Sequence, residues 1–517
     1  MILILLALIL FQPVQNHTLS GRVIDASGGA LTGATVTVSC NDERSEAVTD
    51  AAGRFRVDNL PASRCQVVAG LDGFVAAERL VNLGGRAPVV VDFRLAVRSF
   101  SAQIVVTPGR GAEEDSAYVA QGASLVGQAE LQSRPYAIVT QALKEEAGVL
   151  AQQTTASQGS PMLRGFTGQR NLYLLDGVRY NTAAWRGGPS QYVAWVPSAG
   201  LDRIEIVRGP ASAQYGSDAL GGTIGVFSET PRFTGPDKAT GSLALTLGSA
   251  NRLRSSDVGG AITRRGMSAR VSASVGAASD LRVGRGIDSH AAVTRFLGVP
   301  STGGTLENTG YAQAGISAGA RVRVASSRSL SISYRHSEQG DSHRYDQEMG
   351  GNGRYRSVFG PQRLDFGFLR YESARQSWFD EVSATVSVNR QADGRAEQRR
   401  PTERLDEQVN TTTAIGYSVQ ATRTLAPRFK ALFGADVYDE FIGGARVLTA
   451  PDGSTSRARP DIPDGTRYTS VGVFWQQNAE VIPGRLHLRG GVRYGDFTFC
   501  SVRDDSLGVP EDSIRTR

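Results

Sequence analysis

The stretch EVSATVSVN, residues 381–389, alternates strictly between apolar and polar side chains. Its apolar set holds the even positions: Val382, Ala384, Val386 and Val388. Successive side chains of a β-strand point to opposite faces, so this pattern predicts a strand with one apolar and one polar face. The same alternation recurs in GSLALTLGS at 241–249 and in RLHLRGGVRY at 485–494. Residues 241–517 are therefore predicted to consist mainly of such strands.

The connections between these strands alternate in length. We count about eleven strand-like segments after residue 240, and the short connections fall at Arg264–Met267, Ala325–Arg328, Arg375–Phe379, Leu425–Arg428 and Val481–Gly484. The long polar connections lie near 279–310, 340–363, 391–410 and 441–467. Short turns on one side and long loops on the other are typical of an outer-membrane β-barrel with an apolar outer and a polar inner face. A soluble sandwich is the alternative, although it rarely carries so many long loops on one side.

Composition and motifs argue against several functions. The net charge of +6 is carried by dispersed arginines, which does not predict the clustered basic face of a nucleic-acid-binding protein. The chain has no zinc-protease, nucleophile-elbow or phosphate-loop motif. Its five histidines are scattered along the sequence. The sequence therefore predicts neither an enzyme nor a bound metal or cofactor.

The N-terminus begins with the apolar run MILILLALILF, which ends before Pro13. This run is shorter than the roughly 20 residues that a membrane-spanning helix needs, and it fits the apolar part of a secretory signal. We predict a signal peptide at 1–16, with a buried N-terminal strand as the alternative.

Residues 18–97 read as short strands separated by turns at the spacing of a small β-sandwich. In an exported protein, Cys40 and Cys65 could form a disulfide, which would leave Cys500 unpaired. Three unrelated thiols are the alternative.

Residues 98–232 mix strands with short helices. A helix-capable stretch, YAIVTQALKEEAGVL at 136–150, spaces Ile138, Ala142, Glu145 and Val149 by three or four residues. The stretch RIEIVRGPASAQYGSDALGGTIGVFSETP at 203–231 sets two strand-like runs on either side of a glycine-rich turn. It contains no obvious catalytic side chain.

These features together resemble a known family. RIEIVRGPASAQYGSDALGGTIGVFS resembles the end of the plug domain of TonB-dependent outer-membrane receptors, and LRGFTGQRNLYLLDGVRYN at 163–181 resembles the centre of that plug. The stretch GRVIDASGGALTGATVTV at 21–38 resembles a carboxypeptidase-regulatory-like domain, which is a non-catalytic accessory sandwich. The resemblance implies a mainly β protein with five parts: a signal peptide at 1–16, the sandwich at 18–97, a linker with a TonB box at 98–112, an α/β plug at 113–232 and a transmembrane barrel at 241–517.

Within the plug, the resemblance implies a set of structural residues: Arg164, Gly165, Asp176, Gly177, Arg208, Gly209, Pro210, Tyr215, Gly216, Gly221 and Gly222. Glycine permits tight turns and a close approach of the backbone to the wall. Arg164 and Arg208 are expected to pair with acidic groups on the inner wall of the barrel. Gly225 departs from the family pattern, where asparagine is usual, and we expect it to alter only a local turn.

The stretch QIVVTPGR at 103–110 resembles a TonB box. An extended segment can bind a partner by adding a strand to a sheet edge, and this set supplies one: Ile104, Val105, Val106, Thr107 and Pro108. The implied partner is TonB with its inner-membrane energising complex. The alternative is that this segment forms the first structural strand of the plug.

The resemblance implies uptake of a scarce ligand in the bacterial outer membrane, with the N-terminal domain in the periplasm and the outer face of the barrel in lipid. The expected cargo is a ferric siderophore or haem, with cobalamin and oligosaccharide as alternatives. An adhesion or surface-assembly receptor is a rival function. QYGSDALGG favours haem, for which His290 and His343 lie in predicted outer loops, although a lone loop histidine is more often only polar.

The segment TAAWRGGPSQYVAW at 182–195 is expected at the outward apex of the plug. Its candidate ligand-binding residues are Trp185, Arg186, Tyr192 and Trp195. The alternative is that these four pack against the barrel wall.

The number of strands predicts an incomplete barrel. The resemblance implies about twenty-two strands, an even number within the bacterial range, whereas we count about half as many. The last residues, CSVRDDSLGVPEDSIRTR, read as the start of another loop. We therefore expect an open half-barrel partly surrounding its plug, from a chain that is truncated at its C-terminus.

Overall fold

The structure is a computed structural model that describes most of the 517 residues. The described ranges are 17–25, 28–40, 43–71, 77–84, 89–95, 105–109, 112–115, 122–134, 136–153, 155–188, 192–229, 237–282, 305–306, 308–325, 327–340, 342–348, 354–374, 378–426, 428–482 and 485–516. The chain divides into two compact units, Met1–Ile104 and Val105–Arg517. The predicted signal peptide at 1–16 lies outside the described residues.

The first unit is a β-sandwich of two sheets. One sheet has the order β4-β1-β7, with β8 also paired to β1, and the other has the order β3-β2-β5-β6. The strands are β1 His17–Asp25, β2 Thr35–Cys40, β3 Glu43–Val48, β4 Arg54–Leu60, β5 Arg64–Gly70, β6 Ala77–Asn82, β7 Val89–Val90 and β8 Phe93–Leu95. Alternate residues of each inner strand fill one apolar core, in which Val36, Val38 and Val67 are fully buried.

A disulfide joins two neighbouring strands within the second sheet of the sandwich. Cys40 and Cys65 lie directly opposite each other on β2 and β5 and form this bond. Cys500, in the second unit, is half-buried and free.

Within Val105–Arg517, the part that mixes short helices with strands is called the plug unit. Its sheet has the order β11-β16-β17-β14-β15, in which only β14 and β17 pair in parallel. Its elements are β11 Gly122–Val126, α1 Gln128–Ser133, η2 Val139–Leu143, β12 Val149–Gln152, β13 Ser160–Leu163, η3 Gly168–Arg170, β14 Asn171–Leu175, β15 Val178–Arg179, η4 Tyr192–Trp195, β16 Leu201–Arg208, α2 Ser212–Tyr215 and β17 Gly222–Ser228. A separate hairpin precedes it, formed by β9 Val105–Gly109 and β10 Ala112–Asp115.

The helix predicted over 136–150 is wrong in extent. Only the short 3-10 helix η2 forms, because Gly148 has φ +74° and Val149 then starts strand β12. Ile138 and Ala142 are buried, but Glu145 is largely exposed, so the predicted spacing does not make one apolar face.

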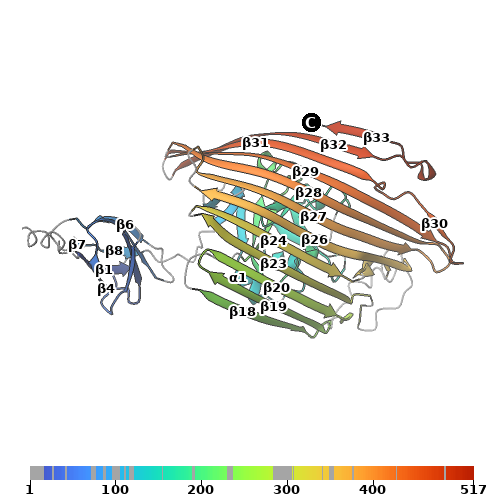
Figure 1. The fold of residues 1–517 in the computed structure, drawn as a ribbon. Helices are drawn as coiled ribbons and strands as arrows, with labels where there is room; N and C mark the ends of the chain where they lie inside the picture. Colours follow the sequence, from blue (N-terminus) through green and yellow to red (C-terminus); the bar gives the residue numbers. More distant parts are fainter. Residues whose placement is uncertain are drawn as a thin grey trace, which may run out of the picture. The chain divides into compact units, whose positions relative to one another are not determined.

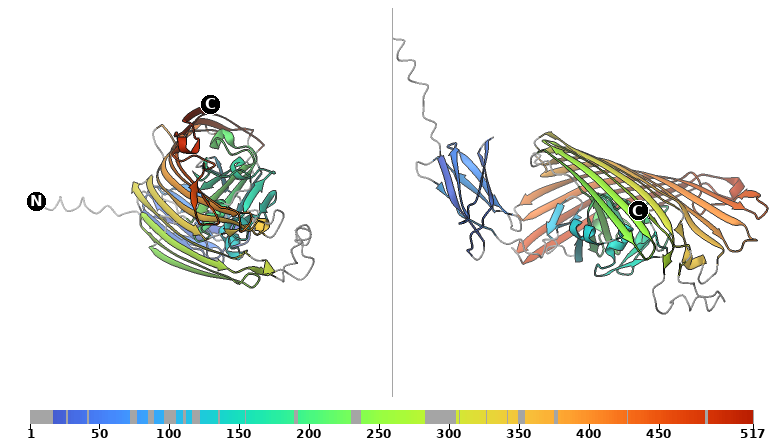
Figure 2. Two further views of the ribbon diagram at one scale, coloured as in Figure 1. Left: turned by 90° about the vertical axis from the view of Figure 1, so that its right-hand side faces the viewer. Right: turned by 90° about the horizontal axis from the view of Figure 1, so that it is seen from below.

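The wall is one large antiparallel sheet. Its path runs β18-β19-β20-β23-β24-β26-β27-β28-β29-β31-β32-β33, with β25 on β26 and β30 on β29. The strands are β18 Lys238–Gly248, β19 Leu253–Arg264, β20 Met267–Ala278, β23 Tyr311–Ala325, β24 Arg328–Gln339, β25 Ser342–His343, β26 Arg356–Ala374, β27 Glu381–Gln398, β28 Leu405–Ala426, β29 Phe429–Thr449, β30 Thr455–Arg457, β31 Thr466–Ile482, β32 Leu486–Ser501 and β33 Asp512–Thr516. Outside this path are β21 Leu281–Arg282, β22 Thr305–Leu306, α4 Tyr345–Glu348 and η5 Asp505–Leu507. Figure 1 shows the wall as a curved sheet, and the left view of Figure 2 shows the plug unit on its concave side.

The two faces of the wall follow the predicted alternation. On β27, Val386 and Val388 are exposed on the outer face, whereas Thr385 and Ser387 are buried on the inner face beside the plug unit. The mainly β architecture with an open antiparallel sheet is confirmed. Within the described residues, β18 and β33 are not paired with each other. None of the described helices is long and apolar enough to cross a lipid bilayer.

The five short connections occur where the sequence predicts them, but three of the long ones are shorter than expected. The one near 340–363 ends where β26 starts, at Arg356. β27 continues to Gln398 and β28 starts at Leu405, so most of the predicted loop at 391–410 is strand. β29 likewise extends to Thr449, into the loop predicted at 441–467. Polar residues suggested loops here, but a hairpin whose backbone is fully paired also accepts polar side chains.

Candidate functional site

The glycine-rich turn at 208–222 brings the plug backbone into close contact with itself. Gly222 has φ +151°, and a Cβ there would collide with the carbonyl oxygen of Val207. A Cβ on Gly221 would collide with the side chain of Asn171. Tyr215, at the end of α2, is buried in a small apolar cluster with Leu172 and other side chains. These positions need glycine because β16, β17 and the β13–β14 connection meet here.

Gly225 lies within strand β17, opposite Leu174 and Glu205, so the expectation that it alters a local turn is wrong. The ring of Phe227 covers Gly225 and would collide with any Cβ. Arg203 stacks over this ring, 4.3 Å from its centroid.

The expectation that Arg164 and Arg208 pair with the wall is also wrong. Arg208 donates to the Ser124 hydroxyl at 2.9 Å and lies 3.9 Å from Glu146, and both partners belong to the plug unit. Arg164 is exposed, and none of the ion pairs among the described residues involves it. Burial lowers the pKa of Arg208, Glu146 opposes that change, and the nearby Arg164 adds to it. Arg208 therefore finds its partners within the plug unit, with Arg164 as a nearby charge.

Asp176 makes the contact with the wall that was expected of those arginines. Its carboxylate accepts from the Ser228 backbone N–H at 2.6 Å and from Arg335 of β24 at 3.0 Å. Its backbone carbonyl accepts from Arg370 of β26 at 2.6 Å. Asp176 and Gly177 form the turn between β14 and β15, both with positive φ. Burial alone would raise the pKa of Asp176, but Arg335 and the Ser228 hydrogen bonds outweigh it and lower the pKa.

The apex residues are buried against the wall. Trp185 donates to Gln391 of β27 at 2.7 Å, and Trp195 donates to Gln362 of β26 at 2.7 Å. Each of these two side chains is no more than 4 % exposed. As placed, both tryptophans contact the wall and offer no free face to a ligand, which is the alternative that the sequence left open.

The other two apex residues share one carboxylate of the wall. Arg186 donates to Asp393 at 2.8 Å, and the Tyr192 hydroxyl donates to the other oxygen of Asp393, also at 2.8 Å. Burial, and then the Asp393 carboxylate, raise the pKa of Tyr192, so its hydroxyl stays protonated and can donate. The side chain of Arg186 keeps 22 % of its surface exposed. A ligand contact by Arg186 therefore stays a prediction.

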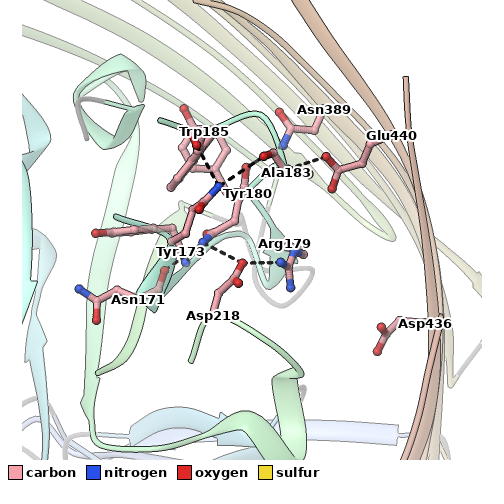
Figure 3. A network of polar contacts seen from close by, with 12 residues as sticks. Asn171, Tyr173, Arg179, Tyr180, Ala183, Trp185, Asp218, Asn389, Asp436 and Glu440 are labelled. Atoms are coloured by element: carbon pink, nitrogen blue, oxygen red, sulfur yellow. Dashed lines mark hydrogen bonds and ion pairs between the residues drawn. The ribbon is translucent and has the colours of Figure 1, made fainter. Parts of the chain in front are cut away.

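A polar network continues from the apex towards the turn at Asp218. Figure 3 shows Asn389 directed at the carbonyl of Tyr180, to which it donates at 2.9 Å, and Glu440 accepting from the Ala183 N–H at 2.7 Å. Arg179 pairs with Asp218, and both belong to the plug unit. Glu440 is almost fully buried on β29, where it meets the plug backbone.

The sequence analysis did not predict the wall residues that contact the plug unit at this site. The missed residues are Arg335, Gln362, Asn389, Gln391, Asp393 and Glu440. A usable signal was present, because the buried odd positions of EVSATVSVN continue in the same register through Asn389, Gln391 and Asp393. Amide and carboxylate side chains at consecutive inner positions of a strand indicate a partner inside the barrel.

The predicted TonB-box segment is partly described. Val105–Gly109 forms β9, in which Val105 lies opposite Asp115 and Val106 opposite Glu114 of β10. Among the described strands, β9 pairs only with β10, so its other edge is not part of a sheet. Ile104 lies outside the described residues. Neither reading of this segment, as partner-binding strand or as structural strand, is excluded by that pairing.

Of the two loop histidines, the structure describes only His343. His343 lies 3.0 Å from Glu348, its neighbour in the same connection, and His290 lies outside the described residues. No cluster of metal-binding side chains occurs among the described residues.

Comparison with known families identifies both domains. Residues 115–223 match the TonB-dependent receptor plug domain, and residues 18–96 match the carboxypeptidase regulatory-like domain. The chain therefore carries the plug domain of a TonB-dependent outer-membrane receptor. This domain places the receptor in the bacterial outer membrane.

Similar proteins are transporters and receptors rather than enzymes. The receptor is 33 % identical over 127 residues to the vitamin B12 transporter BtuB of Vibrio vulnificus, which covers 24 % of this chain and 20 % of that protein. It is 30 % identical over 186 residues to the ferric enterobactin receptor PirA of Pseudomonas aeruginosa, covering 32 % of this chain and 24 % of that protein. These matches span about a fifth to a quarter of each relative's length.

The fold itself is shared with a solved structure. The copper transporter OprC matches with a TM-score of 0.59 and 16 % identity, over 76 % of this chain and 59 % of that chain. At this identity the likeness shows the fold alone.

Proposed function

We propose that this receptor takes up a scarce ligand, a ferric siderophore or haem, across the outer membrane by a TonB-dependent mechanism. The observation that carries the proposal is the polar character of the contact between plug unit and wall. At least eight wall strands form hydrogen bonds with the plug unit: β19, β20, β23, β24, β25, β26, β27 and β29. Among the buried side chains that the structure describes, those of the wall that join the plug core come from β26, as Leu364, Phe366 and Phe368.

Such a contact suits a plug that must be displaced. A hydrogen bond between protein groups contributes only about 0.5–1.5 kcal/mol net, because water replaces the partner when the bond opens. An apolar interface of the same size would instead lose roughly 25 cal/mol for every Å² of apolar surface exposed. Force applied to the N-terminal side of the plug unit can therefore open this contact stepwise.

The proposed point of attachment is the segment that includes β9. We propose that TonB adds a strand to its unpaired edge through backbone hydrogen bonds. Val105→Pro removes a backbone donor and fixes φ, so it should abolish uptake while ligand binding persists. Val105→Ala keeps the backbone donor and is the matched control, with uptake close to that of the wild type.

Uptake of radiolabelled ligand by cells that express each variant distinguishes these outcomes. Equal uptake by the proline and alanine variants would remove β9 as the attachment point. Loss of both binding and uptake in the proline variant would assign β9 a structural role in the plug instead.

The names of the relatives support a class of cargo for this proposal and no single compound. Their names include vitamin B12 and ferric enterobactin, so an iron chelate is one of at least two cargo types among them. Growth of a deletion strain on defined sources of iron, haem included, tests the proposal. Selective loss of growth on one source supports it, whereas unchanged growth with defective attachment to surfaces would favour an adhesion receptor.

A further inference from the structure

A cavity of about 890 Å³ lies between the plug sheet and the inner wall. It is bounded by β14, β16 and β17 of the plug unit, and by wall strands at the end where the short connections lie. It is remote from the apex, since none of Trp185, Arg186, Tyr192 or Trp195 lines it. Its size falls within the roughly 300–1,000 Å³ that ligand sites usually occupy.

The wall side of this cavity is lined with hydroxyl groups and small residues. Inner positions of β24 contribute Ser329, Ser331 and Ser333, and Gly319 of β23 lies opposite Ser333. Short side chains leave room for a solute, and their hydroxyls can both donate and accept hydrogen bonds. The side chains of Gln420 and Thr422 also line the cavity, and each has a buried oxygen without a partner in the structure.

The acidic groups of the cavity are largely neutralised by arginine. Glu205 pairs with Arg203 at 2.8 Å, Glu229 with Arg270 at 3.1 Å and Glu372 with Arg321 at 2.9 Å. Asp176 accepts from Arg335, which lies just outside the cavity. Glu381, at the start of β27, is exposed.

Arg370 makes none of these ion pairs, although Glu372 and Asp176 lie near enough to act on its charge. Its guanidinium lies over the Phe368 ring, 4.7 Å from the centroid. Its guanidinium donates to the Asp176 backbone carbonyl at 2.6 Å and to the Thr385 hydroxyl at 3.1 Å, both of which are uncharged acceptors. No ion pair involving Arg370 occurs among the described residues. A guanidinium has five donors in a planar fork that matches a carboxylate, and two neutral acceptors leave most of that capacity unused.

We propose that this cavity is a second solute site, which binds an anion bearing carboxylate groups, with Arg370 as the residue that recognises it. The carboxylate takes the donors of Arg370 that face the cavity, and the serine hydroxyls of β24 bind its remaining oxygens. This site lies between the plug sheet and the wall, at the opposite end of the plug unit from its apex. The protein can bind a solute there without transporting it.

Equilibrium dialysis of radiolabelled citrate against the purified full chain in detergent tests the site. We expect saturable binding by the wild type that weakens as salt rises, since the attraction between charges is screened. Arg370→Gln should weaken citrate binding by about tenfold or more, the effect of losing a hydrogen bond to a charged group. Arg363→Gln, on the same strand but exposed and paired with Glu338, is the control and should leave binding unchanged.

A second variant separates recognition from folding. Ser331 lies opposite Arg370 on β24 and lines the cavity, so Ser331→Phe fills the space while keeping every charge. It should also reduce citrate binding at least about tenfold, as expected when a bulky side chain occupies a solute's volume. Near-ultraviolet circular dichroism of each variant reports whether the plug aromatics keep their packing.

The proposal would be overturned by no saturable citrate binding in the wild type, or by wild-type affinity in either Arg370→Gln or Ser331→Phe. Loss of binding in the Arg363→Gln control to the same degree would also overturn it, because the attraction would then be general rather than local.

Discussion

The interior of the sandwich and the contact between plug unit and wall differ in the atoms that meet there. In the sandwich, two sheets enclose a continuous apolar core, and a disulfide joins β2 to β5. Between plug unit and wall, amides, carboxylates and guanidinium groups meet backbone carbonyls and one another, beside an 890 Å³ cavity. The difference indicates that the first region is built to persist and the second to open.

A charge placed in the sandwich core should produce the largest effect in a test of this difference. Val67→Asp should destabilise the sandwich by about 4 kcal/mol or more, because the carboxylate has no partner there. Protease resistance of the sandwich strands in the full chain, measured across a urea series, reports the loss. Val48→Asp, at a position 65 % exposed, is the control and should change stability by no more than about 0.5 kcal/mol.

Removal of the disulfide should have the next largest effect. Replacing Cys40 and Cys65 together by serine should cost the sandwich about 2–4 kcal/mol, the usual contribution of a bridge to a small domain. The same urea series measures the change. Emission from Trp185 and Trp195 should not change, and a shift in it would mean that the two regions are coupled.

Asp176 provides a pH test of the contact with the wall. Its pKa is lowered in the folded protein, so its contribution is complete above its ordinary value of 3.8 and is lost as pH falls below that value. Asp176→Asn should weaken the contact by about 1–3 kcal/mol at neutral pH, since buried Arg335 loses its charged partner. With Trp378 and Trp475 replaced by phenylalanine, quenching of Trp185 and Trp195 by acrylamide should then depend less on pH between about 2 and 5, the range in which aspartate titrates. Asp393 accounts for the dependence that remains. A variant that retains the wild-type pH profile would contradict this role.

Tyr192→Phe should have the smallest effect. The substitution keeps the ring that stacks on Trp185, at a centroid distance of 4.4 Å, and removes the two hydrogen bonds of the hydroxyl. One is donated to Asp393 and the other is accepted from the Arg186 backbone N–H, and only the first crosses to the wall. The contact should weaken by about 1 kcal/mol. A much larger loss of resistance to quenching would show that Asp393 holds the apex cooperatively.

The sequence predicted the architecture better than the contacts. Alternation in stretches such as 381–389 located the wall strands and their faces, because one side of each strand meets an apolar surrounding. It did not reveal that Arg208 pairs inside the plug unit while Asp176 reaches the wall. Both are polar residues beside glycine turns, and only the packing of β14 and β17 against β24 decides which of them meets the wall.

The sequence also did not predict how far the strands of the outer hairpins extend. Polar composition at 391–410 is compatible with a loop or with a paired strand in water, and pairing between β27 and β28 decides the outcome. The apex tryptophans could equally have served a ligand or the wall until Gln391 and Gln362 were placed beside them.

The order in which the plug–wall contact and the sandwich open in urea tests the central claim most directly. Trp378 and Trp475 are largely exposed and can be replaced by phenylalanine, which leaves Trp185 and Trp195 as the only tryptophans of the four in the chain. Their emission, followed in urea alongside protease cleavage of the sandwich in the same full-length sample, compares the two regions. We predict that Trp185 and Trp195 become exposed to water at a lower urea concentration than the one at which the sandwich is cleaved. Coincident transitions, or cleavage of the sandwich first, would contradict the account.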